Sequence, residues 1–295
     1  MMQILLGILE EGLVYAIMAL GVYITYKILD FPDLSVDSTF PLGAALTATL
    51  ILADVPPFAT LFLSFLAGAA AGCVTGFIHV KLKVRDLLSG IIVMTGLYSV
   101  NLRIASGRAN LPIFSKDTIF ENQWLASLPQ SISPYMIVII LFAIILVCKI
   151  LLDLYLKTRS GFLLRAVGDN DVIVTSLAKD KGMVKIVGLA IANGFAALAG
   201  CIYCQHKSGF EISMGTGTMV IGLASVIMGT QLFSHMTFIK ATTAVIIGSI
   251  LYKACISIAI SLGLEAFDLK LITAILFLVI LVISNTSKRK VKNHA

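Results

Sequence analysis

The chain has 295 residues, of which 58% are hydrophobic and only 13% charged, and its formal net charge is +6. This composition excludes an ordinary soluble domain, in which about 25% of residues are charged. Long apolar runs recur along the chain, and a membrane-spanning helix needs about 20 such residues, whereas the short alternating segments of a membrane β-barrel are not visible. The sequence therefore predicts an all-α, polytopic transmembrane helical bundle. We interpret the basic excess as an orientation signal and expect no binding of nucleic acid.

The first predicted span covers roughly residues 4–26, and Glu10 and Glu11 lie near its start. Ionisable groups inside a membrane are costly, about 2.5–3.5 kcal/mol each on insertion scales, so the few that are present become candidates for function. We therefore place Glu10 and Glu11 among the candidates for the substrate path. If the first helix starts near Leu13, the two glutamates are only interfacial.

A polar stretch with Pro32, Pro41 and Gly43 follows the first span. These residues interrupt a helix, and the apolar run between Pro41 and Ala53 is short for a complete span. A short, broken segment is typical of a discontinuous or re-entrant helix beside a transport path. An ordinary polar turn between two spans is the alternative.

Three polar residues of this stretch, Asp33, Ser35 and Asp37, are further candidates for the substrate path. The two aspartates are attractive as groups that bind an amine. The alternative is that they cap helix ends, with Asp37 or Ser38 as the N-cap. We favour the capping role for Asp37 and leave both roles open for Asp33.

The third predicted span, roughly residues 58–80, carries Gly68, Gly72 and Gly76 at intervals of four. Small residues on one face let a second helix approach closely, so we interpret this stripe as a packing surface. Basic residues then mark an inner loop. A fourth span returns outward and leads into a long outer loop at residues 106–133, which contacts a partner or covers the helix ends.

A fifth span leads into the longest polar stretch with helix-forming character, residues 157–185. This stretch holds six basic and three acidic residues, which indicates the cytoplasmic side of the membrane. Apolar residues recur within it at helical spacing, which predicts a short amphipathic helix. Such a segment suits contact with a cytoplasmic partner.

Four more spans follow, and the second of them is short. They cover roughly residues 183–205, 215–230, 241–262 and 267–284, and a basic tail then belongs inside. The count is roughly nine, within a range of about 8–10, with the amino terminus outside and the carboxyl terminus inside. A re-entrant segment within residues 27–53 would change the count by one and reverse the amino terminus. We expect residues 1–295 to form a single transmembrane domain.

Motifs for enzymatic chemistry are absent from the sequence. No Gly-Lys dipeptide occurs, so the chain has no P-loop and any ATP must be hydrolysed by another chain. There is also no HExxH motif and no GxSxG nucleophile elbow. Cys201 and Cys204, with His206 nearby, could form a metal or redox site, but we interpret the cysteines as packing residues. We therefore expect no enzyme activity, no metal site and no cofactor in this chain.

Three segments resemble the permease subunits of bacterial ABC importers of the branched-chain amino acid and ribose type. The first, GLVYAIMALGVYIT at residues 12–25, runs into DLSVDSTFPLGA at residues 33–44, similar to a DLSVGS signature with Asp37 in place of glycine. The second, TRSGFLLRAVGDN at residues 158–170, is similar to the pattern T-x-x-G-x-x-x-R-A-x-x-x-N. The third, GLASVIMGTQLF at residues 222–233, is similar to a late span rich in Gly and Ala.

The resemblance implies a type II-like ABC importer permease in the bacterial cytoplasmic (inner) membrane. It implies a homodimer in the lipid bilayer, two cytoplasmic ATP-binding cassette subunits that bind ATP and Mg, and an extracytoplasmic solute-binding protein. The stretch ILDFPDLSVDSTFPLGAA is most similar to the subgroup assigned to tryptophan and tyrosine import. The expected function is therefore import of a small solute, an aromatic or related amino acid, by a subunit that is not itself an enzyme.

In this family, the segment that matches residues 161–170 forms the coupling helix, which docks in a groove of the ATPase. We expect Gly161 to break the preceding span, apolar residues to insert into the groove, and Arg165 and Asp169 to form charge-assisted contacts. The resemblance assigns this coupling role to Gly161, Phe162, Arg165, Ala166, Val167, Gly168, Asp169 and Asn170.

The sequence alone leaves two other functions open. In a stand-alone secondary transporter or channel, the intramembrane carboxylates would be proton or ion sites. A membrane-embedded enzyme that acts on lipid would need a nucleophile or a metal set, and neither is found in the sequence.

Overall fold

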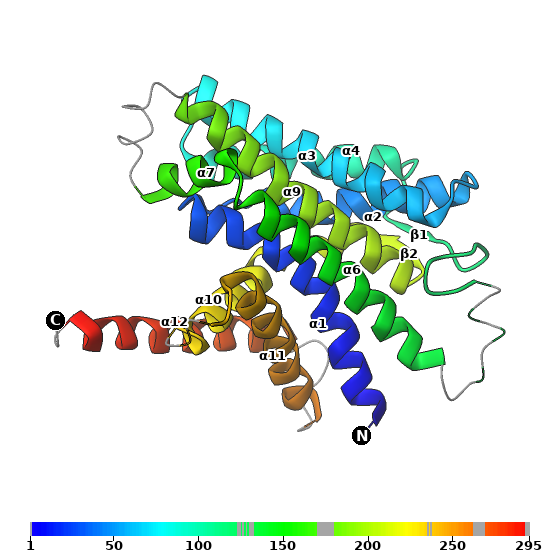
Figure 1. The fold of residues 1–295 in the computed structure, drawn as a ribbon. Coiled ribbons are helices and arrows are strands. Elements are labelled where there is room, and N and C mark those ends of the chain that lie inside the picture. The colour runs from blue at the N-terminus through cyan, green and yellow to red at the C-terminus, as the bar shows by residue number, and fades with distance from the viewer. Residues whose placement is uncertain are drawn as a thin grey trace.

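A computed structural model describes residues 2–122, 125, 127, 129, 133–169, 180–234, 236, 238–261 and 269–292. Most of these residues belong to helices that run back and forth through one bundle (Figure 1). In chain order the elements are α1 (Met2–Val22), the π-helix η1 (Tyr23–Ile28), α2 (Val36–Leu52), α3 (Pro57–Lys81), α4 (Asp86–Ile104), β1 (Asn110–Pro112), α6 (Ser133–Tyr155), α7 (Arg159–Asp169), α9 (Lys181–His206), β2 (Gly209–Glu211), the 3-10 helix η2 (Ile212–Gly215), α10 (Thr218–Leu232), α11 (Ala241–Ser261) and α12 (Leu269–Lys292).

The lengths and composition of the helices confirm the predicted polytopic bundle. Within the described residues, seven segments are long and apolar enough to cross a membrane, with η1 counted as part of α1 and η2 as part of α10. The helix α2 and the apolar part of α12, Leu271–Val282, are shorter. Seven of the roughly nine predicted spans therefore have the length of a membrane helix, and α2 and α12 occupy the positions of the other two.

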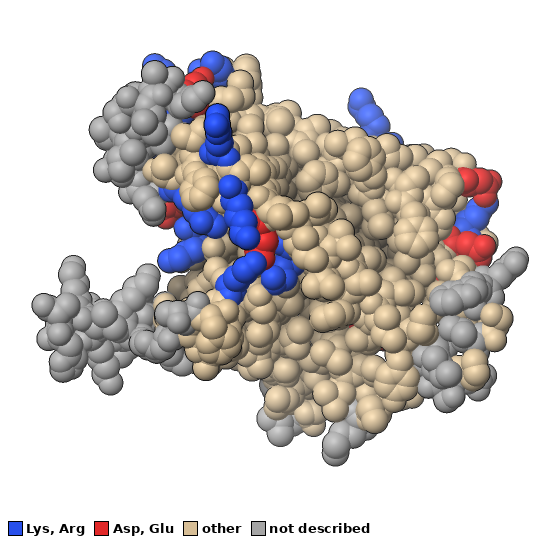
Figure 2. Space-filling model, viewed as in Figure 1, with Lys and Arg blue, Asp and Glu red and all other residues tan. Residues whose placement is uncertain are grey.

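The two ends of the bundle differ in charge. Figure 1 shows α7 near the end of α3 and the start of α9, while the start of α1 and the two strands lie toward the other end. Most of the Lys and Arg side chains visible in Figure 2 lie toward the α7 end. Basic residues favour the cytoplasmic side, so we assign this end to the cytoplasm and the start of α1 to the outside.

The helix α9 forms the centre of the bundle and packs against α3, α2 and α1. A β-carbon at Gly68 would stand 2.3 Å from the carbonyl oxygen of Asn193, and one at Gly72 would stand 2.2 Å from that of Leu189. No side chain fits at such distances, so glycine is required for the backbones of α3 and α9 to touch. The interpretation of the glycine stripe as a packing surface agrees with this contact.

The break in the helix before α2 lies at a different position from the predicted one. Residues 29–35 are not helical, and Phe31 and Asp33 within them are buried. The helix α2 then begins at Val36 and continues through Pro41 without a break. The carbonyl of Asp37, which an N–H at position 41 would normally bond, lies against Gly215 instead. The interruption therefore precedes Val36, and the prediction that Pro41 breaks the helix is wrong.

Part of the long outer loop covers the outer ends of α2 and α9. Its strand β1 pairs antiparallel with β2, with Leu111 opposite Phe210. Both side chains are buried in a small apolar cluster with Ala44, Ala45 and other residues of α2. Within the described residues of this loop, covering the helix ends is therefore the role that the contacts support.

Candidate functional site

The cytoplasmic helix α7 is held by its first turn and by two glycines. The Thr158 hydroxyl accepts a hydrogen bond from the N–H of Gly161 at 3.2 Å and so caps the helix. A β-carbon at Gly161 would stand 2.4 Å from the carbonyl oxygen of Tyr155, the last residue of α6. The prediction that Gly161 breaks the preceding span is wrong, because the break falls at residues 156–158 and Gly161 lies inside α7.

The two faces of α7 have different environments. Leu164 and Val167 are buried, and a β-carbon at Gly168 would collide with the carbonyl oxygen of Ile28 at the end of η1. Phe162 is 60% exposed, and Arg165 is also exposed. One face thus packs on η1, the end of α6 and α9, and the other presents an aromatic ring and a cation.

The remaining predicted coupling residues lie inside α7, at its end or outside the described residues. Ala166 is half-buried and packs against the main apolar core. Asp169 is the last residue of α7. Asn170 lies outside the described residues.

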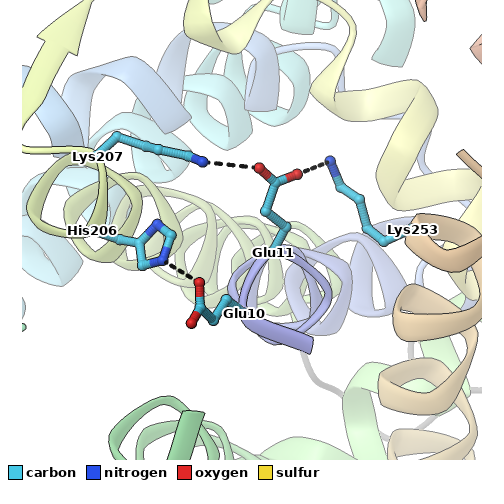
Figure 3. Close-up of polar contacts among 5 residues, drawn as sticks. All are labelled: Glu10, Glu11, His206, Lys207 and Lys253. Carbon is cyan, nitrogen blue, oxygen red and sulfur yellow. Dashed lines mark hydrogen bonds and ion pairs between the residues drawn. The ribbon is translucent and has the colours of Figure 1, made fainter. Parts of the chain in front are cut away.

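At the outer end, a cluster of charged side chains joins α1, α9 and α11 (Figure 3). The carboxylate of Glu11 lies between two lysines, 3.0 Å from Nζ of Lys207 and 3.2 Å from Nζ of Lys253. Oε2 of Glu10 lies 3.1 Å from Nε2 of His206. The two glutamates predicted from the sequence therefore contact three basic residues: His206 at the end of α9, Lys207 directly after it, and Lys253 of α11.

The outer cluster differs in exposure from one side to the other. The side chain of Lys253 is only 11% exposed, that of Glu11 is 35% exposed and that of Lys207 is 43% exposed. Burial lowers the pKa of Lys207, but the hydrogen bond and the charge of Glu11 outweigh it and raise this pKa above its usual value. Lys207 therefore keeps its charge at neutral pH.

Aromatic rings continue the outer cluster toward the middle of the bundle. Nζ of Lys253 lies 3.9 Å from the ring centroid of Tyr15, a cation–π distance. The Tyr15 ring stacks on Phe40 at 5.9 Å and meets Tyr203 edge-on at 5.9 Å. The outer end of the bundle thus brings a carboxylate, two ammonium groups and aromatic rings together in one region.

Asp33 and Ser35 belong to a hydrogen-bond network inside the bundle. Oδ1 of Asp33 accepts from the N–H of Ser35 at 2.9 Å, and Oδ2 accepts from Nδ2 of Asn193 on α9 at 2.7 Å. Oδ1 of Asn193 accepts in turn from the hydroxyls of Ser35 and Thr39. All four side chains have no exposed surface. The network fastens the non-helical residues 29–35 and the start of α2 to the central helix.

Asp37 caps a helix, but not the helix that contains it. From the first turn of α2, its carboxylate accepts from the N–H of Gly217 at 3.1 Å and the N–H of Met219 at 2.7 Å. It also accepts from the hydroxyl of Thr218 at 3.1 Å. These groups form the start of α10, where unpaired N–H groups and the helix dipole favour a carboxylate. The capped helix is therefore α10, and Ser35, which precedes α2, makes no side-chain cap bond.

The candidate cysteine site does not assemble. Cys201 and Cys204 are buried free thiols, and His206 pairs with Glu10 instead. Among the described residues, no group of three His, Cys, Asp or Glu side chains is placed to hold a metal ion.

Sequence reasoning did not find Asn193, Lys207 or Lys253. Polar residues within apolar spans are a usable signal, because burying them in a membrane is costly, and Asn193 and Lys253 both lie within spans. The sequence could not predict their partners, because 160 residues separate Asn193 from Asp33 and 242 separate Lys253 from Glu11.

The chain matches a family of known proteins over most of its length. Residues 4–284 match the family described as branched-chain amino acid transport system / permease component. The chain is 44% identical over 291 residues to a tyrosine transport system permease protein of Clostridioides difficile, covering 99% of this chain and 95% of that protein.

Two more relatives have lower sequence identity to this chain. The chain is 33% identical over 286 residues to an uncharacterized protein of Rickettsia prowazekii, covering 94% of this chain and 96% of the relative. It is 26% identical over 226 residues to the ribose import permease protein RbsC of Escherichia coli (strain K12), covering 76% of this chain and 68% of the relative. No solved structure matches the chain significantly.

The cap on α10 predicts a measurable loss of stability. We expect Asp37→Ala to lower the free energy of unfolding by about 1–2 kcal/mol, because it removes the side-chain cap. Asp37→Asn keeps one acceptor oxygen and should recover part of the loss. Thermal unfolding of the purified protein in detergent measures both. The matched control is Asp117→Ala, because Asp117 is exposed and has no hydrogen bond or ion pair within the described residues. Equal losses at the two positions would contradict the cap.

The outer cluster predicts a dependence between Glu11 and Lys253. Glu11→Leu leaves the nearly buried Lys253 without its counter-ion, and we expect a loss of about 2 kcal/mol or more. The double variant Glu11→Leu, Lys253→Leu removes both charges together and should regain much of that stability. The same unfolding measurement applies, and a double variant no more stable than Glu11→Leu alone would rule out the coupling.

Proposed function

This chain belongs to the family of permease components of branched-chain amino acid transport systems, and we propose that it is the membrane subunit of an ATP-driven importer of an aromatic amino acid. It is a multi-pass protein of the bacterial cytoplasmic membrane, and its homologues are transport permeases, not enzymes. The observation that carries the choice of solute is the 44% identity, over nearly the full length of both chains, to a protein named as a tyrosine transport permease.

The proposed assembly contains two copies of this chain, two ATP-binding cassette subunits on the cytoplasmic side and a solute-binding protein outside. The ATPase subunits supply the ATP and Mg site, since the sequence has no P-loop of its own. The helix α7 lies at the end of the bundle that we assign to the cytoplasm, which supports a contact between α7 and these subunits. Its inner face packs on η1, the end of α6 and α9, so a force applied at Phe162 and Arg165 reaches the ends of the spanning helices.

On this proposal, the outer cluster lies where the solute enters. An amino acid carries one ammonium and one carboxylate group, and Glu11, Lys207 and Lys253 offer groups of complementary charge. The half-buried ring of Tyr203 lies beside them and could meet an aromatic side chain, whereas the ring of Tyr15 is buried between Phe40 and Lys253. We therefore keep Glu10 and Glu11 as proposed residues of the substrate path.

The buried polar residues have a different proposed role. Asp33 and Ser35 have no exposed surface, and Asp37 is bonded to the start of α10. We propose that they shape the helices beside the path without contacting solute. This assignment also weakens the alternative of a stand-alone secondary transporter, because its candidate ion-binding carboxylates are occupied by structural hydrogen bonds.

Reconstitution tests the proposed function. Liposomes that contain this permease, its ATPase subunits and an external binding protein should accumulate labelled tyrosine only when ATP is inside. Unlabelled tryptophan or phenylalanine should compete, and ribose should not. Uptake by liposomes that contain this chain alone would indicate a secondary transporter, and uptake of ribose without tyrosine would overturn the solute class.

A charge reversal tests the coupling role of α7. We expect Arg165→Glu to lower ATP-dependent uptake and substrate-stimulated ATP hydrolysis at least about tenfold, because it reverses a charge at the proposed interface. The amount of permease in the membrane should not change, because Arg165 is exposed. The control is Lys81→Glu, an exposed cation on the same side of the membrane but outside α7. Normal coupled hydrolysis in Arg165→Glu would count against docking through this residue.

A further inference from the structure

A polar cavity of about 280 Å³ lies at the cytoplasmic end of the bundle, beside the coupling helix. It is formed where α6, α7, η1 and the start of α11 meet. The residues that matter for its chemistry are Tyr23, Asp153, Lys157, Arg165, Lys240 and Thr242. We call this the inner pocket.

Positive charge exceeds negative charge in the inner pocket. The carboxylate of Asp153 lies 3.1 Å from Nζ of Lys149 and 3.0 Å from Nζ of Lys240, and it accepts from the Thr242 hydroxyl at 2.7 Å. Lys157 and Arg165 also line the pocket, and within the described residues neither has an ion pair. Three cationic side chains thus line the pocket with one carboxylate, which Lys149 also pairs from outside the lining. Figure 2 shows basic side chains gathered around an acidic group on this face of the molecule.

The backbone adds to the preference for an anion. The helix α11 begins at Ala241, and Ala241 and Thr242 line the pocket. The positive end of a helix dipole favours a negatively charged group. Across the pocket, Arg165 carries a planar guanidinium that can bind two oxygens of a phosphate group at once.

The depth of the inner pocket indicates the source of the anion. Asp153 lies near the end of the membrane span Tyr135–Tyr155, so the pocket lies where the apolar layer gives way to lipid headgroups. Exposed apolar side chains lie next to pocket residues in the chain: Leu154 is 55% exposed and Phe238 is 80% exposed. Cations at this level attract anionic lipids of the cytoplasmic leaflet.

We propose that the inner pocket binds the phosphate group of an anionic phospholipid from the cytoplasmic leaflet. Lys157 and Arg165 contact the phosphate from the side of α7, and Lys240 contacts it from the side of α11. Asp153 holds Lys149 and Lys240 in place and keeps their charges from repelling one another. The bound lipid then links the coupling helix to α11 through one shared anion.

Thermal unfolding of the full chain in detergent tests this proposal. The probes are short-chain phosphatidylglycerol, short-chain phosphatidylcholine and inorganic phosphate. The pocket variant is Lys157→Gln, Lys240→Gln. The control is Lys81→Gln, Lys83→Gln, which removes the same charge from the exposed end of α3 and the loop after it, on the same side. If the pocket variant does not fold, Lys157→Gln alone replaces it, because no ion pair or hydrogen bond of that side chain lies within the described residues.

We expect phosphatidylglycerol to raise the unfolding temperature of the wild type and of the control variant at the same lipid concentration. In the pocket variant, the concentration for half of this shift should rise at least about tenfold, because two of the cations are lost. Phosphatidylcholine and inorganic phosphate should have little effect.

Three results would overturn the proposal. The first is an equal response to phosphatidylglycerol in the pocket variant and the control. The second is equal stabilisation by inorganic phosphate, which would assign the pocket to a free anion. The third is a pocket variant that still responds to the lipid but no longer binds the ATPase subunits, which would assign the pocket to an acidic protein surface.

Discussion

Glycine and alanine bring the backbone of α9 into contact with α1, α2 and α3, and the rest of the structure depends on this close packing. Lipid chains are as apolar as helix side chains, so dispersion contacts and interhelical hydrogen bonds hold helices together in a membrane. Gly43, Gly68 and Gly72 each face a carbonyl oxygen of α9 at a distance that leaves no room for a side chain. The resulting position of α9 sets the depth of Asn193, and Asn193 holds Asp33 and the start of α2.

The carboxylates of Asp33 and Asp37 accept hydrogen bonds from backbone N–H groups that would otherwise be unpaired inside the bundle. The non-helical residues 29–35 and the start of α10 expose backbone N–H groups inside the bundle, and an unsatisfied group there costs several kcal/mol. Asp33 accepts from the N–H of Ser35, and Asp37 accepts from two N–H groups at the start of α10. Both are ionisable groups at depth, and the contacts account for them as structural groups of the irregular backbone.

The charged groups at the two ends of the bundle are arranged differently. At the outer end, Glu11 is shared by Lys207 and Lys253, and this joins α1, α9 and α11. At the cytoplasmic end, Asp153 does not balance the cations around it, and an exposed face of α7 lies beside that excess charge. On the proposed function, the outer end meets the solute and the inner end meets the ATPase subunits, with one rigid set of helices between them.

The sequence by itself determined the class of protein, the approximate limits of most spans and the short helix within residues 157–185, because hydrophobic length and periodicity are local properties of the chain. Its charge bias also predicted the orientation. Tertiary structure alone decided what the polar residues do. Asp37 caps α10 from 180 residues away, and Gly161, which was expected to break the preceding span, packs against the end of α6 from inside α7. A hydrogen bond or a close backbone contact depends on which helices become neighbours, and no single segment specifies that.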